Sequence, residues 1–238
     1  MRIQLVKLLA VSCCFVFFSC ITINTIVRQH FESLKSKKEI VVVIFGDSIS
    51  GGGGISQTGT SYGTFLKAML EKLFQCHVSL INSSRQDESY RIAHRRIQED
   101  ILSYRPDIVF VMLGFVDAFL PGILPTTHLD NINKFLSELK KSGVFVIVLT
   151  TTGLRDVETK NDMRVQILEN YNNVVRDCTR YYHYPLIDIA RHMDNLRLSK
   201  PREYLSMFGD YILLNDKGKE YVADYIYHRI TTILGDQF

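Results

Sequence analysis

The sequence predicts an α/β fold in which five parallel strands form a sheet between two layers of helices. Short runs rich in Val, Ile and Phe alternate five times with longer segments whose apolar residues recur at helical spacing. These runs are apolar at nearly every position, as expected for strands buried on both faces of a parallel sheet. The chain has 238 residues, which is enough for one domain with a sizeable core.

Each element follows from its own pattern. The first run, EIVVVIF, is apolar after its opening Glu39, and the helical stretch that follows it repeats apolar residues every three or four positions. The expected strands are 39–45, 78–81, 107–113, 144–149 and 184–189. The expected helices are 62–74, 89–103, 128–143, 163–181 and 216–234. Strands that alternate with helices in this way form parallel sheets.

Ligands of such sheets bind outside the carboxyl ends of the strands, so residues directly after a strand are candidates for a site. The first strand runs into GDSISGGGG, which places Ser48 at that edge. This stretch is not a phosphate-binding loop, because no lysine follows its glycines. It is not a G-x-S-x-G elbow either, because Ser50 occupies the place of the second glycine. Ser48 is therefore either a nucleophile or the cap of the next helix.

Four blocks in order resemble the SGNH or GDSL hydrolases, a family of serine esterases and lipases. The blocks are VVVIFGDSISGGGG, VSLINSSRQDES, RPDIVFVMLGFVDAF and GDYILLNDKGKEYVADYI. The resemblance extends over residues 39–234. It implies a flavodoxin-like three-layer sandwich and the hydrolysis of an acyl or acetyl ester.

The resemblance also implies a set of site residues. Ser48 matches the nucleophile, and Asp210 matches the aspartate that orients a histidine base. The oxyanion of the reaction would be met at three positions, Ser48, Asp87 and Val116. The family has a glycine at the second of these and an asparagine at the third, so both positions are substituted here.

The histidine position itself, three residues after Asp210, is Leu213. Loss of a triad member costs on the order of 10⁴ to 10⁶ in turnover, and loss of one oxyanion donor costs about 10² to 10³. Val116 has no donor in its side chain, and the carboxylate of Asp87 would repel an oxyanion. The standard mechanism therefore cannot run on these residues.

A different histidine would have to act as the base of a rewired site. His128 is the one candidate on the correct side of the sheet, because it follows the third strand and its loop. Two hypotheses stay open. The substitutions favour a divergent or non-catalytic family member that binds its ligand without the standard chemistry. The alternative is an active serine esterase or deacetylase that acts on a cell-envelope glycan or lipid through Ser48.

The amino-terminal segment predicts membrane association. Residues 8–27 contain no charged residue, and twenty helical residues span about 30 Å, the thickness of a bilayer core. An uncleaved anchor, a cleaved signal peptide and a lipoprotein signal ending at Cys20 all fit this stretch. We expect residues 1–38 to be a signal or anchor with a polar tether (28–38), and residues 39–238 to be the hydrolase-like domain. An exported body is favoured, although the basic residues after the span leave a cytoplasmic orientation open.

The charge and the cysteine content indicate which classes of partner and ligand to expect. The net charge is +3, but residues 1–39 hold six basic and two acidic residues, so the rest of the chain is close to neutral. Nucleic acid is therefore not an expected partner of the body. Only Cys76 and Cys178 lie outside the apolar segment, with no metal-ligand spacing. No metal or cofactor is expected, and a small ester, glycan or lipid is the expected ligand.

Overall fold

The computed structural model describes residues 23–52, 60–119, 124–155 and 162–235. Its strands form one sheet in the order β2-β1-β3-β4-β5, and every pair is parallel. The strands are β1 (Glu39–Gly46), β2 (His77–Asn82), β3 (Ile108–Met112), β4 (Val146–Leu149) and β5 (Leu186–Ile187). This order is that of a flavodoxin-like sheet, so the predicted fold class of the body is confirmed.

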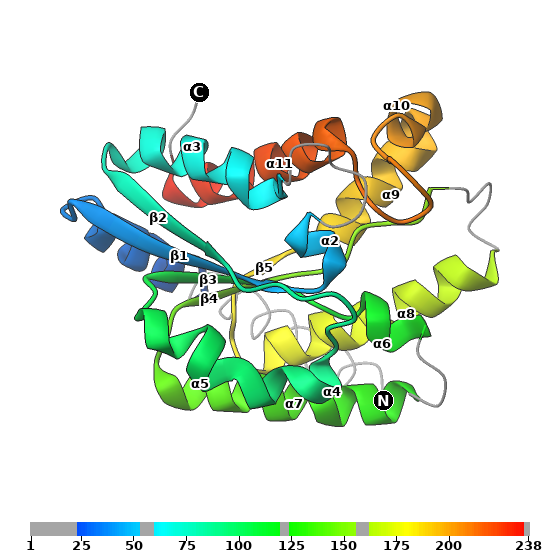
Figure 1. Cartoon of the computed structure of the whole chain (residues 1–238), viewed down its shortest axis with the longest axis horizontal. Helices are drawn as coiled ribbons and strands as arrows, with labels where there is room; N and C mark the ends of the chain where they lie inside the picture. Colours follow the sequence, from blue (N-terminus) through cyan, green and yellow to red (C-terminus); the bar gives the residue numbers. More distant parts are fainter. Residues whose placement is uncertain (1–22, 53–59, 120–123, 156–161, 236–238) are drawn as a thin grey trace, which may run out of the picture.

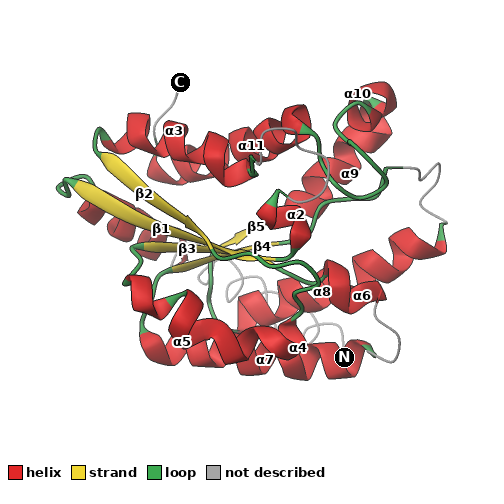
Figure 2. Cartoon of the chain, viewed as in Figure 1, coloured by secondary structure: helices red, strands yellow, loops and turns green. Residues whose placement is uncertain are grey.

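Helices cover both faces of the sheet (Figures 1 and 2). One face carries α3 (Tyr62–Phe74), α9 (Ile189–Ser199) and α11 (Asp216–Leu234). The other face carries α7 (Pro125–Ser142), α8 (Met163–Tyr181) and a chain of short helical turns. The short elements are α2 (Ser48–Gly51), α4 (Tyr90–Ala93), η1 (His94–Arg96), α5 (Ile97–Asp100), η2 (Leu102–Tyr104), α6 (Phe115–Phe119) and α10 (Pro201–Leu205).

The continuous apolar runs are explained by burial on both faces. In β3, Ile108 and Phe110 pack in the cluster under α3 and α11, while Val109 and Val111 pack in the cluster under α7 and α8. Successive side chains of a strand point to opposite faces, so both sets must be apolar. The carboxyl ends of the strands all point to one edge, where α2 and α6 begin (Figure 1).

The helix predicted over 89–103 is broken into four short turns. The backbone of Arg96 (φ −107°, ψ −4°) and that of Ile101 (φ −126°, ψ −65°) interrupt it. The apolar spacing nevertheless holds, because Ala93, Ile97 and Ile101 are all buried in one cluster. The pattern thus predicted the buried face correctly but not the continuity of the helix.

Several helices were not predicted, among them α9 and α10. The signal for α9 was present, since Ile189, Met193 and Leu196 recur at helical spacing and are buried. Its amino end is capped by Asp188, whose carboxylate accepts a hydrogen bond from the backbone N–H of Arg191. The expected strand 184–189 is shorter than predicted, because this cap ends it at Ile187.

The expected polar tether (28–38) is wrong, because residues 23–34 form a helix that packs on the body. Val27, Phe31 and Leu34 lie on one side of this helix, are at most 1% exposed, and belong to the same core cluster as α3 and α11. Their spacing of four and three residues is the spacing of an amphipathic helix.

Polar contacts also hold this helix. The His30 ring stacks on Phe145 with centroids 3.8 Å apart, and its Nε2 lies 2.8 Å from the carbonyl oxygen of Asp107, just before β3. Lys37 forms an ion pair with the carboxylate of the same aspartate. Burial lowers the pKa of His30, which favours the neutral form of the ring.

The predicted membrane segment (8–27) falls mostly on residues 8–22, which lie outside the described residues. Among the residues that are described, no helix combines the length and the apolar character that a membrane span requires. The end of the predicted segment, residues 23–27, belongs to the docked helix. The division of the chain at 38/39 stays a prediction.

Candidate active site

Ser48 is the first residue of α2, immediately after β1. The residue before it, Asp47, is fully buried, and its Oδ1 accepts a hydrogen bond from the backbone N–H of Ile49 at 3.0 Å. Asp47 is therefore the helix cap, and the reading of Ser48 as the cap is wrong. Ser48 is partly exposed, and its hydroxyl makes no hydrogen bond to any described residue.

Close packing surrounds this turn. A Cβ on Gly46 would collide with Ser50 and with the carbonyl oxygen of Met112 in β3. Gly52 has φ 75° and ends α2, and a Cβ there would collide with the carbonyl of Thr60. These two positions therefore require glycine. The remaining glycines of the quoted run, Gly53 and Gly54, lie outside the described residues.

The electrostatics of the turn are set by Asp47. Burial raises the pKa of the Asp47 carboxyl to about 7, and the negative charge of Asp117 acts in the same direction. The N–H groups of Ile49 and Ser50 oppose this shift. A buried carboxyl that gains or loses its proton near neutral pH thus lies next to Ser48 in the chain.

The loop after β2 runs beside the end of β1. The backbone N–H of Ser83 bonds to the carbonyl of Ile44 at 2.8 Å, and that of Arg85 bonds to the carbonyl of Gly46 at 3.0 Å. Asp87 in this loop is exposed and has φ 56°, a left-handed backbone that favours glycine. A glycine is the residue that the resembled family has at this position.

Arg96 holds this loop in place. Its guanidinium is bonded to the carbonyl of Ser83 at 2.7 Å and forms ion pairs with Glu88 and Asp100. Because Ser83 and Glu88 lie on either side of Asp87 in the chain, the loop is held at both ends. The guanidinium is 12% exposed, so these bonds are largely shielded from water.

The third block follows β3. Gly114 has φ 119°, and Val116 lies partly exposed in α6. The next residue, Asp117, is fully buried, and its Oδ2 accepts a hydrogen bond from the backbone N–H of Tyr90 at 3.0 Å. Asp117 therefore links the third block to the end of the second.

The replacement base considered above, His128, is fully buried in α7. Its ring packs against Tyr171 with centroids 4.6 Å apart and against Tyr90 at 5.6 Å. Its Nδ1 is 3.5 Å from Asp117 Oδ1, beyond the usual hydrogen-bond distance, and its Nε2 has no hydrogen-bond partner among the described residues. A substrate cannot touch a ring in this position, which argues against its acting as the base.

The other six histidines are held elsewhere. His30 contacts Asp107 before β3, and His77 pairs with Glu71 at the start of β2, so both lie at the amino edge of the sheet. His94 contacts Lys134 in the helical layer, and His192 stacks on Tyr225 in the opposite layer. The two remaining residues, His183 and His228, lie just before β5 and within α11.

The fourth block forms a tight turn before α11. The Oδ1 of Asp210 accepts hydrogen bonds from the backbone N–H groups of Ile212 at 2.8 Å and Leu213 at 2.6 Å. The N–H of Gly209 in turn bonds to the carbonyl of Leu213. The side chain of Leu213 packs against the core cluster, where the family has a histidine facing its serine.

This turn adjoins α6. Ile212 packs against a small cluster that contains Ala118 of α6 together with Leu154 and Leu168. The first, second and third blocks are joined by the hydrogen bonds described above, and the fourth meets the third through this cluster. That Ser48, Asp87, Val116 and Asp210 share one cleft stays a prediction.

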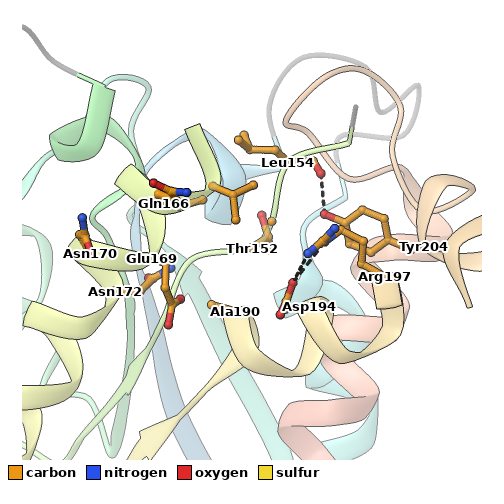
Figure 3. A pocket seen from close by; sticks show the side chains of 13 residues that line it. Thr152, Leu154, Gln166, Glu169, Asn170, Asn172, Ala190, Asp194, Arg197 and Tyr204 are labelled. Carbon is orange, nitrogen blue, oxygen red and sulfur yellow. Dashed lines mark hydrogen bonds and ion pairs between the residues drawn. The ribbon is translucent and has the colours of Figure 1, made fainter. Parts of the chain in front are cut away.

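The structure also contains a cavity that the sequence analysis missed. It has a volume of about 460 Å³ and lies between α8, α9 and the loop after β4 (Figure 3). None of the predicted site residues lines it. Part of its wall is Arg197 and Tyr204, which come from α9 and α10, two of the helices that were not predicted. The run Thr150–Thr152 directly follows β4, so its position at the end of a strand could have indicated a binding site here.

A family model decides the identity. The model of the GDSL-like lipase/acylhydrolase family matches residues 44–221, well over half of the chain. The chain belongs to this family. A lipoprotein of Bacillus subtilis, YqeF, is 24% identical in an alignment 177 residues long, which covers 63% of this chain and 71% of that uncharacterized protein.

Solved structures of esterases and of a lipase/acylhydrolase share the fold of this SGNH/GDSL domain. An acetyl xylan esterase, AlAXEase, superposes with a TM-score of 0.70 at 22% identity over 80% of this chain and 99% of its own. A lipase/acylhydrolase from Enterococcus faecalis gives 0.66 at 20% identity over 81% and 96%. An acetylxylan esterase from Geobacillus stearothermophilus gives 0.67 at 16% identity over 83% and 95%.

Proposed function

We propose that this chain is an exported, membrane-attached SGNH/GDSL domain that binds an acyl-ester ligand without the family's Ser-His-Asp chemistry. The observation that carries the proposal is Leu213. An imidazole is needed there to take the proton of Ser48, and an alkyl side chain packed on the core cannot do so. The other histidines lie at the amino edge of the sheet, in the helical layers, just before β5 or within α11, so none of them takes the place of Leu213.

The oxyanion positions support the same proposal. Val116 offers no donor from its side chain, and Asp87 brings a carboxylate to the loop where a neutral glycine is usual. An oxyanion that forms near Ser48 would have the backbone N–H groups alone for stabilisation. Each lost donor costs about 10² to 10³ in turnover, so a retained base would still leave a slow enzyme.

Attachment to a membrane is supported by the uncharged segment and by the relative. Residues 8–22 are free of charge, and the matching protein of Bacillus subtilis is named a lipoprotein. Among the three readings of the segment, this name favours lipid attachment at Cys20. Cys20→Ser should then move the protein out of the detergent phase in cell fractionation, whereas an uncleaved anchor would keep it there.

The test of the catalytic part is direct. We expect that a fluorophosphonate probe labels the wild type no more than Ser48→Ala, as measured by mass spectrometry of the intact protein. Hydrolysis of p-nitrophenyl acetate should likewise be equal in the two proteins. Labelling of the wild type that disappears in Ser48→Ala would contradict the proposal.

One observation favours the alternative, an active esterase or deacetylase. Ser48 is partly exposed at the start of α2, and its hydroxyl makes no hydrogen bond to a described residue. A nucleophile needs this accessibility. If the probe does label Ser48, the substrate class would be an acyl or acetyl ester on a glycan or lipid, as the esterase neighbours suggest.

A further inference from the structure

The cavity between α8 and α9 is built from four segments of the chain. Figure 3 shows the loop after β4, with Thr152 and Leu154, above α9 and beside α8. Tyr204 of α10 closes one side, and its hydroxyl donates a hydrogen bond to the carbonyl of Leu154 at 2.6 Å. A volume of about 460 Å³ lies in the range of small-molecule sites.

The charged side chains in its wall are already paired. Arg197 is 8% exposed, and its Nε and Nη2 both bond to Asp194, at 3.1 and 2.6 Å. Glu169 is bonded to Arg176, which also pairs with Asp188. A ligand with a net charge would therefore have to break one of these ion pairs or bind without a counter-charge.

The neutral polar groups, in contrast, are available. The side-chain amides of Gln166 and Asn170 make no hydrogen bond to any described residue. Thr152 is fully buried in the same wall, and its hydroxyl has no hydrogen-bond partner in the described part of the chain. The two amides are therefore the groups that an occupant can reach, because the Thr152 hydroxyl has no accessible surface.

Apolar surface completes the wall. Leu154, Val165 and Leu168 lie between the polar groups. A purely alkyl occupant would cover these side chains but leave the two amides without partners. An occupant that offers hydroxyl groups on its rim and C–H groups on its face would satisfy both.

We propose that this cavity binds a neutral, polyhydroxylated ring, that is, a sugar residue. Leu154 and Leu168 share their small cluster with Ala118 of α6 and with Ile212 of the Asp210 turn, so the cavity adjoins α6 and that turn. It is then the place for the glycan part of an acylated ligand whose ester lies at Ser48. That extension rests on the proposed function, whereas sugar binding by the cavity does not.

A series of three ligands tests the charge argument on the full-length protein in detergent. Glucose, glucosamine and glucuronate share one ring and differ in carrying no charge, a positive charge and a negative charge. We expect saturation-transfer NMR to show glucose binding at least about fivefold more tightly than either charged ring. Equal or tighter binding of a charged ring, or tighter binding of hexanol than of glucose, would overturn the proposal.

A pair of variants locates the binding. Gln166→Ala with Asn170→Ala removes two exposed amides from α8, and Gln98→Ala removes an equally exposed amide from α5 on the same protein. Loss of two hydrogen bonds of about 0.5–1.5 kcal/mol each should weaken glucose binding about fivefold or more. Gln98→Ala should bind as the wild type does. If the double variant also binds as the wild type does, the cavity is not the site.

The test of sugar binding can fail or succeed independently of the test of catalysis at Ser48. Ser48→Ala leaves the cavity intact, so glucose binding should be unchanged in it. Ser48-dependent turnover together with glucose binding would refute the non-catalytic proposal and keep the sugar site. Absence of both turnover and glucose binding would support the non-catalytic proposal and refute the sugar site.

Discussion

Two turns at the carboxyl edge of the sheet are built alike but have opposite chemical outcomes. At the first, the carboxylate of Asp47 accepts the N–H of Ile49 and leaves Ser48 partly exposed, with a hydroxyl that bonds to none of the described residues. At the second, the carboxylate of Asp210 accepts the N–H groups of Ile212 and Leu213, and the side chain that follows is a packed leucine. In both turns the aspartate shapes the backbone through bonds that do not depend on the neighbouring side chain. The family's backbone can therefore survive the loss of its base.

The largest expected effect comes from restoring the base. Leu213→His would place an imidazole three residues after Asp210, whose other oxygen could orient it toward Ser48. Because loss of a triad member costs about 10⁴ to 10⁶, we expect partial recovery of p-nitrophenyl acetate hydrolysis, by about 10³. Adding Val116→Asn should raise it by a further factor of about 10². The control is Leu213→His with Ser48→Ala, which should return to background.

The second expected effect is a pH dependence of stability that arises from Asp47 in the first turn. The Asp47 pKa is raised from 3.8 to about 7, so the folded state holds its proton more tightly than the unfolded state does. The stability that this provides is present below pH ~4 and is lost as the pH rises to about 7, by at most about 1.4 kcal/mol per pH unit. Asp47→Asn keeps the cap and removes the titration. In urea unfolding, the free energy of unfolding should decline less across this pH range in the variant than in the wild type. Parallel declines in the two proteins would contradict the raised pKa of Asp47.

A smaller effect is expected at the second turn. Asp210→Ala leaves the N–H groups of Ile212 and Leu213 without their acceptor and should lower the free energy of unfolding by about 1–2 kcal/mol. Asp210→Asn retains an acceptor oxygen and should cost less. Equal stability of Asp210→Ala and wild type in urea unfolding would show that the carboxylate is not needed to hold this turn.

The smallest expected effect is on stability, when the Ser48 hydroxyl of the first turn is removed. Because Asp47 is the cap and the Ser48 hydroxyl has no hydrogen bond to a described residue, Ser48→Ala should change the free energy of unfolding by less than about 0.5 kcal/mol. A loss of 1 kcal/mol or more in calorimetry would mean that the hydroxyl has a structural role.

Periodicity explains what could be predicted of the fold. The helices 163–181 and 216–234 were predicted with the bounds they have, because long amphipathic patterns persist across them. The docked helix 23–34 carried the same signal in Val27, Phe31 and Leu34. It was missed because the polar residues between them were interpreted as a tether beside a membrane segment.

The candidate site was predictable only as far as local sequence reaches. The motifs located Ser48 and Asp210 beside the strand end and the last helix, and they located the substitution at Leu213. They could not show that Asp47 rather than Ser48 is the cap, or that His128 is buried. Both facts depend on tertiary packing around the strand ends, as does the cavity formed by α8 and α9.

The docked helix has a practical consequence for work with the isolated body. A shortened chain that begins at β1 would follow the apparent boundary in the sequence, but it would uncover the core side chains that Phe31 and its neighbours now shield. Such a newly exposed apolar surface promotes self-association. Preparations of the body in solution should therefore begin before residue 23, so that the helix stays with the domain it covers.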